Sequence, residues 1–218
     1  FCPGGLGGWV SYVKKPLLAP LELTAGSLIV NPRGLEPFEL MDHRGGTFSQ
    51  QSLEGSWTLM SFGYSHCPDM CPTTLTSLAS INGALTEKQK SHLQIVFVFV
   101  DWERDQPERL QEYLPFFDRT FTGATGPEEA TDKLTTQLGV LWQRAEGGDD
   151  ENYLVDHSGT TYLFGPDGRL RALFGYPLTP ADVVGDGWSA CDGDCDDDDA
   201  TLDPADIDGD GWSTCDGD

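Results

Sequence analysis

The segment LQIVFVFV, at residues 93–100, constrains the fold of this chain more than any other feature. It is a run of strand length, apolar apart from Gln94 and rich in β-branched and aromatic residues. A strand that is apolar on both faces needs a covering layer on each side, as a central parallel strand has in an α/β protein. The run therefore predicts a layered α/β domain around a buried sheet.

The segments on either side of this strand alternate between strand and helix patterns. An apolar run at residues 57–63 is typical of a strand. We expect a helix to follow it, with Pro72 at its first position and an apolar face up to about Leu85. Beyond the central strand we expect a helix after Pro107, which Pro115 ends or kinks.

Two helices and two hairpins complete the pattern. A helix is expected at residues 127–138, and a strand ending at Phe164 turns at GPDG and returns over residues 169–176. A short hairpin is expected near residues 38–49, and a last helix starts within residues 178–184. Strand–helix–strand units followed by a terminal hairpin predict a thioredoxin-like α/β sandwich with an added N-terminal hairpin.

Charge divides the chain into a body and a tail. The whole chain has a net charge of −23. The segment from Asp182 to Asp218 contains 14 Asp residues and no Lys, Arg or Glu, whereas residues 1–181 contain 22 acidic and 13 basic residues. We therefore expect an irregular lead-in at residues 1–25, a thioredoxin-like domain at 26–181 and an irregular acidic tail at 182–218. An acidic surface argues against nucleic acid as a partner, because phosphate binding needs the opposite sign.

The motif Cys67-Pro-Asp-Met-Cys71 lies where the strand at residues 57–63 meets the following helix. The N-terminus of a helix stabilises negative charge, so we expect lowered thiol pKa values there. Two thiolates four residues apart can point into the same space, and a soft two-sulfur site prefers Cu(I). By its spacing alone, the pair is just as typical of a structural disulfide.

A third donor for copper would be a neutral imidazole, and the chain offers His43, His66, His92 and His157. We expect His43 at a turn and His92 near a helix end to be exposed to solvent, and His66 to point away from Cys67. His157 precedes the penultimate strand, in a loop that lies beside the active-site cysteines in a thioredoxin-like fold. Thioredoxins have a cis-proline in that loop; its absence here favours a metal ligand over thiol–disulfide catalysis.

Four segments together resemble the SCO/SenC family of copper chaperones: FGYSHCPDMCPTTL, DWERDQPERLQEYL, FTGATG and YLVDHSGTTYLFGPDGRL. The resemblance implies a thioredoxin-like fold and a membrane-anchored copper domain that faces the periplasm or the intermembrane space. It also implies Cys67, Cys71 and His157 as the ligands of one Cu(I) or Cu(II) ion. Trp102 stands where the family has a proline, and we expect this departure to affect the nearby loop rather than the ligands.

The resemblance implies a copper chaperone that assists assembly of the Cu-A centre of cytochrome c oxidase, and not an enzyme. Its expected partners are the oxidase subunit that carries the Cu-A site, or another copper acceptor, and a thiol reductase. Two alternatives stay open. One is a thiol–disulfide oxidoreductase that uses Cys67 and Cys71, and the other is a redox or copper sensor of the same fold.

The tail repeats itself, since DVVGDGWSACDGD recurs as DIDGDGWSTCDGD 24 residues later. In the second copy Asp206, Asp208, Asp210 and the following Gly211 resemble the start of an EF-hand-type calcium loop, and Asp216 is a candidate later ligand. The tail resembles the Asp/Gly/Cys-rich metal-binding repeats of the MopE and thrombospondin type-3 kinds. A disordered acidic spacer and a calcium-dependent adhesion module are the alternatives.

Overall fold

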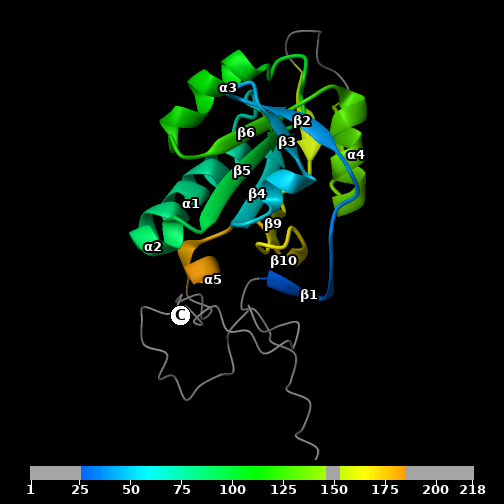
Figure 1. Ribbon diagram of the computed structural model, residues 1–218. Coiled ribbons are helices and arrows are strands. Elements are labelled where there is room, and N and C mark those ends of the chain that lie inside the picture. The colour runs from blue at the N-terminus through cyan, green and yellow to red at the C-terminus, as the bar shows by residue number, and fades with distance from the viewer. Residues whose placement is uncertain (1–25, 146–152, 185–218) are drawn as a thin grey trace, which may run out of the picture.

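The computed structural model describes residues 26–145 and 153–184 (Figure 1). The predictions for the lead-in at residues 1–25 and for nearly all of the acidic tail fall outside these ranges. So do the four candidate calcium ligands, Asp206, Asp208, Asp210 and Asp216. Within the described residues, no helix is both long and apolar enough to cross a membrane.

Eight strands form one mixed sheet, in the order β1-β10-β9-β4-β5-β6-β2-β3. Their bounds are β1 Gly26–Arg33, β2 Glu39–Asp42, β3 Thr47–Ser49, β4 Trp57–Gly63, β5 Leu93–Phe99, β6 Thr122–Thr125, β9 Thr161–Phe164 and β10 Leu170–Phe174. The apolar run predicted as a central parallel strand is β5, which pairs in parallel with β4 on one side and β6 on the other. The predicted hairpins are β2–β3 and β9–β10, both antiparallel.

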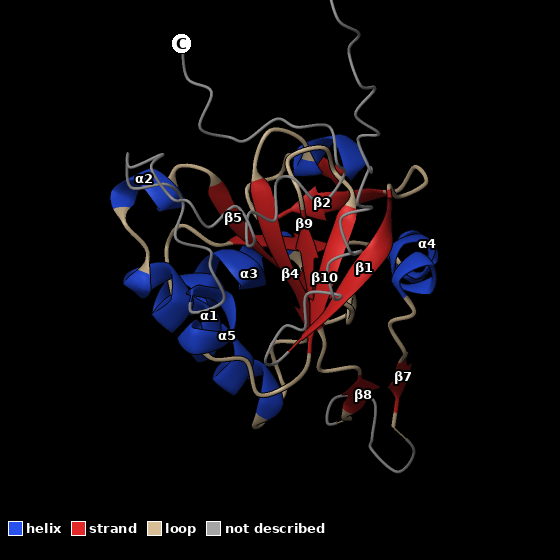
Figure 2. Ribbon diagram, turned by 90° about the horizontal axis from the view of Figure 1, so that it is seen from below, coloured by secondary structure: helices blue, strands red, loops and turns tan. Residues whose placement is uncertain are grey.

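Helices cover both faces of this sheet. Their bounds are α1 Met70–Ala84, α2 Glu87–Lys90, α3 Pro107–Tyr113, α4 Glu128–Leu138 and α5 Pro180–Val184, with 3₁₀ turns η1 at Gln50–Leu53 and η2 at Leu114–Phe116. Figure 2 shows α1, α3 and α5 on one side of the sheet and α4 on the other. The side chains of β5 from Ile95 onward are buried between these layers, which confirms the predicted α/β sandwich.

Two helix ends differ in detail from the sequence prediction. Helix α1 begins at Met70, not at Pro72, because Asp69 takes the N-cap position and its carbonyl accepts the Thr73 N–H at 3.2 Å. Pro72 then occupies the third position, where a missing N–H costs no helical hydrogen bond. The predicted break at Pro115 is confirmed, since α3 passes there into the 3₁₀ turn η2.

The sequence pattern reveals neither β1 nor three further strands, two of which matter for the site. β7 at Trp142–Arg144 and β8 at Val155–His157 form a separate antiparallel pair, here called the ribbon. It lies apart from the eight-stranded sheet (Figure 2). The third, β6, is built of small residues in FTGATG, and it places Gly123 against the side chain of Leu114.

Candidate metal centre

The three residues predicted to bind copper lie side by side in the folded chain. The Sγ atoms of Cys67 and Cys71 and a ring nitrogen of His157 all lie within 4.8 Å of one another. The Cys71 Sγ is 3.2 Å from the His157 Nε2, and the Cys71 N–H donates to the Cys67 Sγ at 3.4 Å. Within the described residues, this is the one group of three or more His, Cys, Asp or Glu side chains that could hold a metal ion.

The two cysteines differ in their surroundings. Cys67 is partly exposed in the loop that leaves β4, whereas Cys71, in the first turn of α1, is 1% exposed. Burial raises the pKa of the Cys71 thiol far above its ordinary value, and a hydrogen bond with the backbone of Tyr64 offsets only part of this effect. For Cys71 the expected lowering by the helix N-terminus is therefore wrong, because desolvation outweighs it. A bound cation reverses this balance, since a coordinating thiol is deprotonated.

His157 is arranged as a neutral ligand. Its Nδ1 lies 3.1 Å from the Ser158 carbonyl oxygen, which can only accept a hydrogen bond. The proton is therefore assigned to Nδ1, and the lone pair of Nε2 faces Cys71. Burial lowers the pKa of His157, which favours the neutral imidazole. The ring of Tyr64 packs edge-on against it, with ring centroids 5.8 Å apart.

Gly63 gives the Cys71 thiol its space at the end of β4. A Cβ atom at Gly63 would lie 2.5 Å from the Cys71 Sγ and 2.7 Å from the Cζ of Phe97. Both distances are shorter than any ordinary contact, and both neighbours are buried. A glycine is thus required here for the thiol to sit between the strand and helix α1.

We predict that Gly63→Ala destabilises the copper-free protein by about 1–3 kcal/mol, the usual cost of overpacking a core. It should also weaken copper binding, because the added methyl displaces the Cys71 Sγ. Gly83→Ala, in helix α1, is the matched control: nothing lies within 4 Å of its added Cβ, so it should be neutral or stabilising. Urea unfolding and copper titration measure both effects. Equal stability and affinity of Gly63→Ala and wild type would contradict the prediction.

Of the other three histidines, two behave as expected and one does not. His66 is exposed, with its Nδ1 3.1 Å from the Ser65 Oγ, and His92 is exposed after α2. The prediction of an exposed His43 is wrong, since this residue is buried. Its Nδ1 accepts the Gly123 N–H at 3.1 Å, so that it joins the end of β2 to β6. This role depends on β6, which the sequence pattern does not reveal.

Sequence reasoning also missed Asp105, which supports the cysteine loop. Asp105 is 0% exposed, and its Oδ2 accepts the backbone N–H of Ser65 at 3.0 Å. This bond fixes the chain two residues before Cys67. Burial raises the pKa of Asp105 to about 6, although hydrogen bonds from Ser65 act in the opposite direction.

The raised pKa of Asp105 predicts a pH-dependent stability. The folded state keeps the proton up to about pH 6, whereas an unfolded Asp loses it near pH 3.9. Stability from this group is therefore complete below the unfolded pKa and is lost as the pH rises through the folded pKa. Relative to Asp105→Asn, the free energy of unfolding of the wild type should fall by on the order of 2 kcal/mol between about pH 4 and about pH 7.5. The free energies of unfolding are measured by urea unfolding of the two reduced, copper-free proteins. If they changed with pH in parallel, the predicted effect of Asp105 would be refuted.

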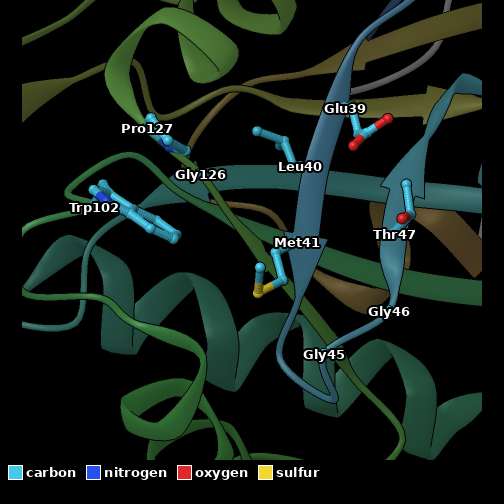
Figure 3. A pocket seen from close by; sticks show the side chains of 9 residues that line it. All are labelled: Glu39, Leu40, Met41, Gly45, Gly46, Thr47, Trp102, Gly126 and Pro127. Atoms are coloured by element: carbon cyan, nitrogen blue, oxygen red, sulfur yellow. The ribbon is translucent and has the colours of Figure 1, made fainter.

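A pocket lies near the carboxyl ends of β5 and β6, between the β2–β3 hairpin and Trp102 (Figure 3). It has a volume of about 190 Å³, and Met41, Thr47 and Gly126 are among its lining residues. None of the three donor residues lines it. Trp102 therefore lines this loop pocket and is not part of the donor group.

Comparison with known proteins supports the resemblance seen in the sequence. The SCO1/SenC family matches residues 29–187. An SCO2-like protein of Rickettsia conorii is 37% identical over 183 residues, which cover 82% of this chain and 89% of the relative. The human mitochondrial SCO1 homologue is 32% identical over 173 residues, which cover 79% of this chain and 58% of that protein.

Comparison with solved structures supports the same family and identifies the fold. Copper-bound ScoI of Bradyrhizobium japonicum has a TM-score of 0.64 and 34% identity, covering 71% of this chain and 97% of that one. Copper-bound ScoI of Arabidopsis thaliana has a TM-score of 0.65 and 31% identity, covering 70% of this chain and 94% of that one. The fold is therefore thioredoxin-like, and the chain belongs to the SCO1/SenC family.

Proposed function

We propose that this chain is a copper chaperone that binds one copper ion, as cargo, through the Sγ atoms of Cys67 and Cys71 and the Nε2 of His157. The observation that carries the proposal is the placement of these three donors within 4.8 Å of one another. Membership of a family with copper-bound solved structures supports it.

The chemistry of the donor set fits copper in both oxidation states. Two thiolates suit the soft Cu(I) ion, which accepts few ligands, and the neutral imidazole adds the borderline donor that Cu(II) prefers. Cys67 and His157 are both partly exposed, while Cys71 is buried. A half-open site of this kind suits an ion that has to be passed on.

Copper loading of the reduced protein tests this function. The chain should take up one Cu(I), and X-ray absorption should show sulfur neighbours together with imidazole nitrogen. A spectrum with only oxygen and nitrogen neighbours would reject the proposed ligands.

We further propose that the cargo goes to the Cu-A centre of cytochrome c oxidase, from a membrane-anchored position facing the periplasm. Family membership supports this acceptor and this location. The test is transfer: the copper-loaded chain is mixed with a soluble copper-free Cu-A domain, and the visible spectrum of the Cu-A centre is followed. The Cys67→Ala variant, mixed with the same amount of copper, is the control for copper that is free in solution. If the Cu-A spectrum appeared no faster than with free copper, the proposed delivery to the Cu-A centre would be rejected.

Thiol–disulfide exchange is the second candidate, because Cys67 is partly exposed and its partner thiol lies close by. The raised pKa of Cys71 opposes it, since the thiolate is the reactive form. Visible absorption and a disulfide-reduction assay distinguish the two functions. A chaperone loaded with Cu(II) should absorb strongly in the visible through its thiolate ligands, whereas a reductase should reduce the disulfides of a test protein.

For the tail we propose a calcium site at Asp206, Asp208, Asp210 and Asp216, supported by the alternating carboxylates of the second repeat. The first repeat has a valine in place of the second Asp, so it should bind weakly. We predict that calcium changes the tryptophan fluorescence in Trp188→Phe but hardly in Trp212→Phe. A flat titration, repeated on a chain lengthened by one repeat, would identify the tail as a spacer.

A further inference from the structure

The proposed copper site joins two separate parts of the fold. Cys67 and Cys71 belong to the junction of β4 and α1, whereas His157 ends β8 in the ribbon. Among the residues that the structure describes, the ribbon pairs only within itself, with Trp142 opposite His157 and Arg144 opposite Val155. The distance between the imidazole and the two thiols therefore depends on side chains that attach the ribbon to the main body.

Tyr153, two residues before β8, makes several of these attachments. It is 5% exposed, and its ring lies between two guanidinium groups. The Cζ of Arg104 is 3.6 Å from the ring centroid, and the Cζ of Arg144, in β7, is 3.8 Å from it. A cation over an aromatic face is attracted by the ring, and more strongly where water is excluded. The stack thus joins the ribbon's first strand to the loop after β5.

Hydrogen bonds fix the orientation of this stack. The Tyr153 hydroxyl donates to the Asp101 Oδ1 at 2.7 Å, and the Arg104 Nη1 donates to the Tyr153 carbonyl oxygen at 3.0 Å. The Arg104 Nε donates to the Asp101 Oδ2 at 2.5 Å, in an ion pair whose two side chains are largely buried. Both the ring and the backbone of Tyr153 are therefore held by the main body.

The same guanidinium also lies near Tyr64, which packs on the donor group. The Arg104 Cζ is 5.7 Å from the centroid of Tyr64, the residue whose ring packs edge-on against His157. Arg104 thus contacts one tyrosine that anchors the ribbon and one that packs on the imidazole. A displacement of the ribbon would disturb the contact of Arg104 with Tyr153 and the packing of Tyr64 against His157.

We propose that Tyr153 is a positioning residue for His157: clamped between Arg104 and Arg144, it holds the ribbon so that the His157 Nε2 faces the Cys71 Sγ. This inference rests on the proposed copper function. Cu(I) can be held by two thiolates alone, whereas Cu(II) needs the imidazole in a fixed place. Loss of the clamp should therefore weaken Cu(II) binding selectively.

The test is a double-mutant cycle between Tyr153→Leu and His157→Ala. Tyr153→Leu should lower Cu(II) affinity by about 10–100-fold, the usual effect of losing a group that orients a ligand. Cu(I) affinity, measured by competition with a chelator, should change little. In the His157→Ala background, Tyr153→Leu should have no further effect on Cu(II), because the residue acts through the imidazole.

Three other variants separate positioning from general destabilisation. Phe48→Leu removes a buried ring from the edge strand β3 and should leave both copper affinities unchanged. Tyr153→Phe keeps the ring between the guanidinium groups, so it should retain more Cu(II) affinity than Tyr153→Leu. Arg144→Ala removes one exposed wall of the clamp, and it should reproduce the selective loss in smaller degree without endangering the fold.

Three results would overturn the inference. Two of them are an equal loss of Cu(I) and Cu(II) binding in Tyr153→Leu and an additive effect with His157→Ala, and the third is unchanged Cu(II) binding in Tyr153→Leu. If the wild type bound no copper, the proposed function itself would fail. If the wild type bound Cu(II) through His157 and Tyr153→Leu did the same, the inference alone would fail.

Discussion

A disulfide between Cys67 and Cys71 should abolish copper binding by this chain, from one ion per chain to none. The two Sγ atoms lie within 4.8 Å of each other, so a small movement suffices to join them. Copper needs the thiolate form of both residues, and the sulfur of a disulfide is a poor donor. The copper content of the oxidised protein, measured after removal of free metal, checks the prediction.

In this oxidation experiment the other four cysteines must not form disulfides. The experiment is therefore carried out in a background where Cys2, Cys191, Cys195 and Cys215 are all replaced by Ala, so that only the proposed ligand pair can be oxidised. Re-reduction should restore the full copper content, which shows that the loss comes from the disulfide and not from unfolding. Full uptake of copper by the oxidised protein would remove Cys67 and Cys71 from the site.

Much of the fold could be predicted because its central elements have strong local patterns. β5 is apolar on both faces, and the run at residues 57–63 became β4, parallel to it. The strand β6 could not be found in the same way. Its residues are small because the strand packs closely against the side chains of Leu114 and Phe99, and small residues have no strand pattern of their own.

The electrostatics of the site could not be predicted from local sequence. Burial opposes the lowering of a thiol pKa by a helix N-terminus, and for Cys71 the effect of burial is the larger one. Asp105 and Ser65 are 40 residues apart, and Tyr153 lies 49 residues from Arg104. Contacts at such separations depend on the packing of whole elements, so single-sequence patterns do not reveal them.

The position of His157 followed from fold-level reasoning instead. The loop before the penultimate strand of a thioredoxin-like fold lies beside the cysteine motif, and here it places Nε2 3.2 Å from the Cys71 Sγ. The same reasoning did not reveal the ribbon. β7 is three residues long and forms its pair across residues 146–152, so no short turn motif marks it.

Of all single substitutions, His157→Ala should produce the largest difference between the loss of Cu(II) affinity and the loss of Cu(I) affinity. We expect Cu(II) affinity to fall by about 100-fold or more, beyond the 10–100-fold typical of losing only a group that orients a ligand. Cu(I) affinity should fall by about tenfold or less, because the two thiolates remain and suffice for this soft ion. The visible absorption of the Cu(II) form and chelator competition for Cu(I) measure the two effects. His66→Ala is the matched control, since this exposed imidazole adjoins Cys67 but faces Ser65 and lies outside the donor group. An equal loss of both ions in His157→Ala would show that the imidazole does not distinguish them.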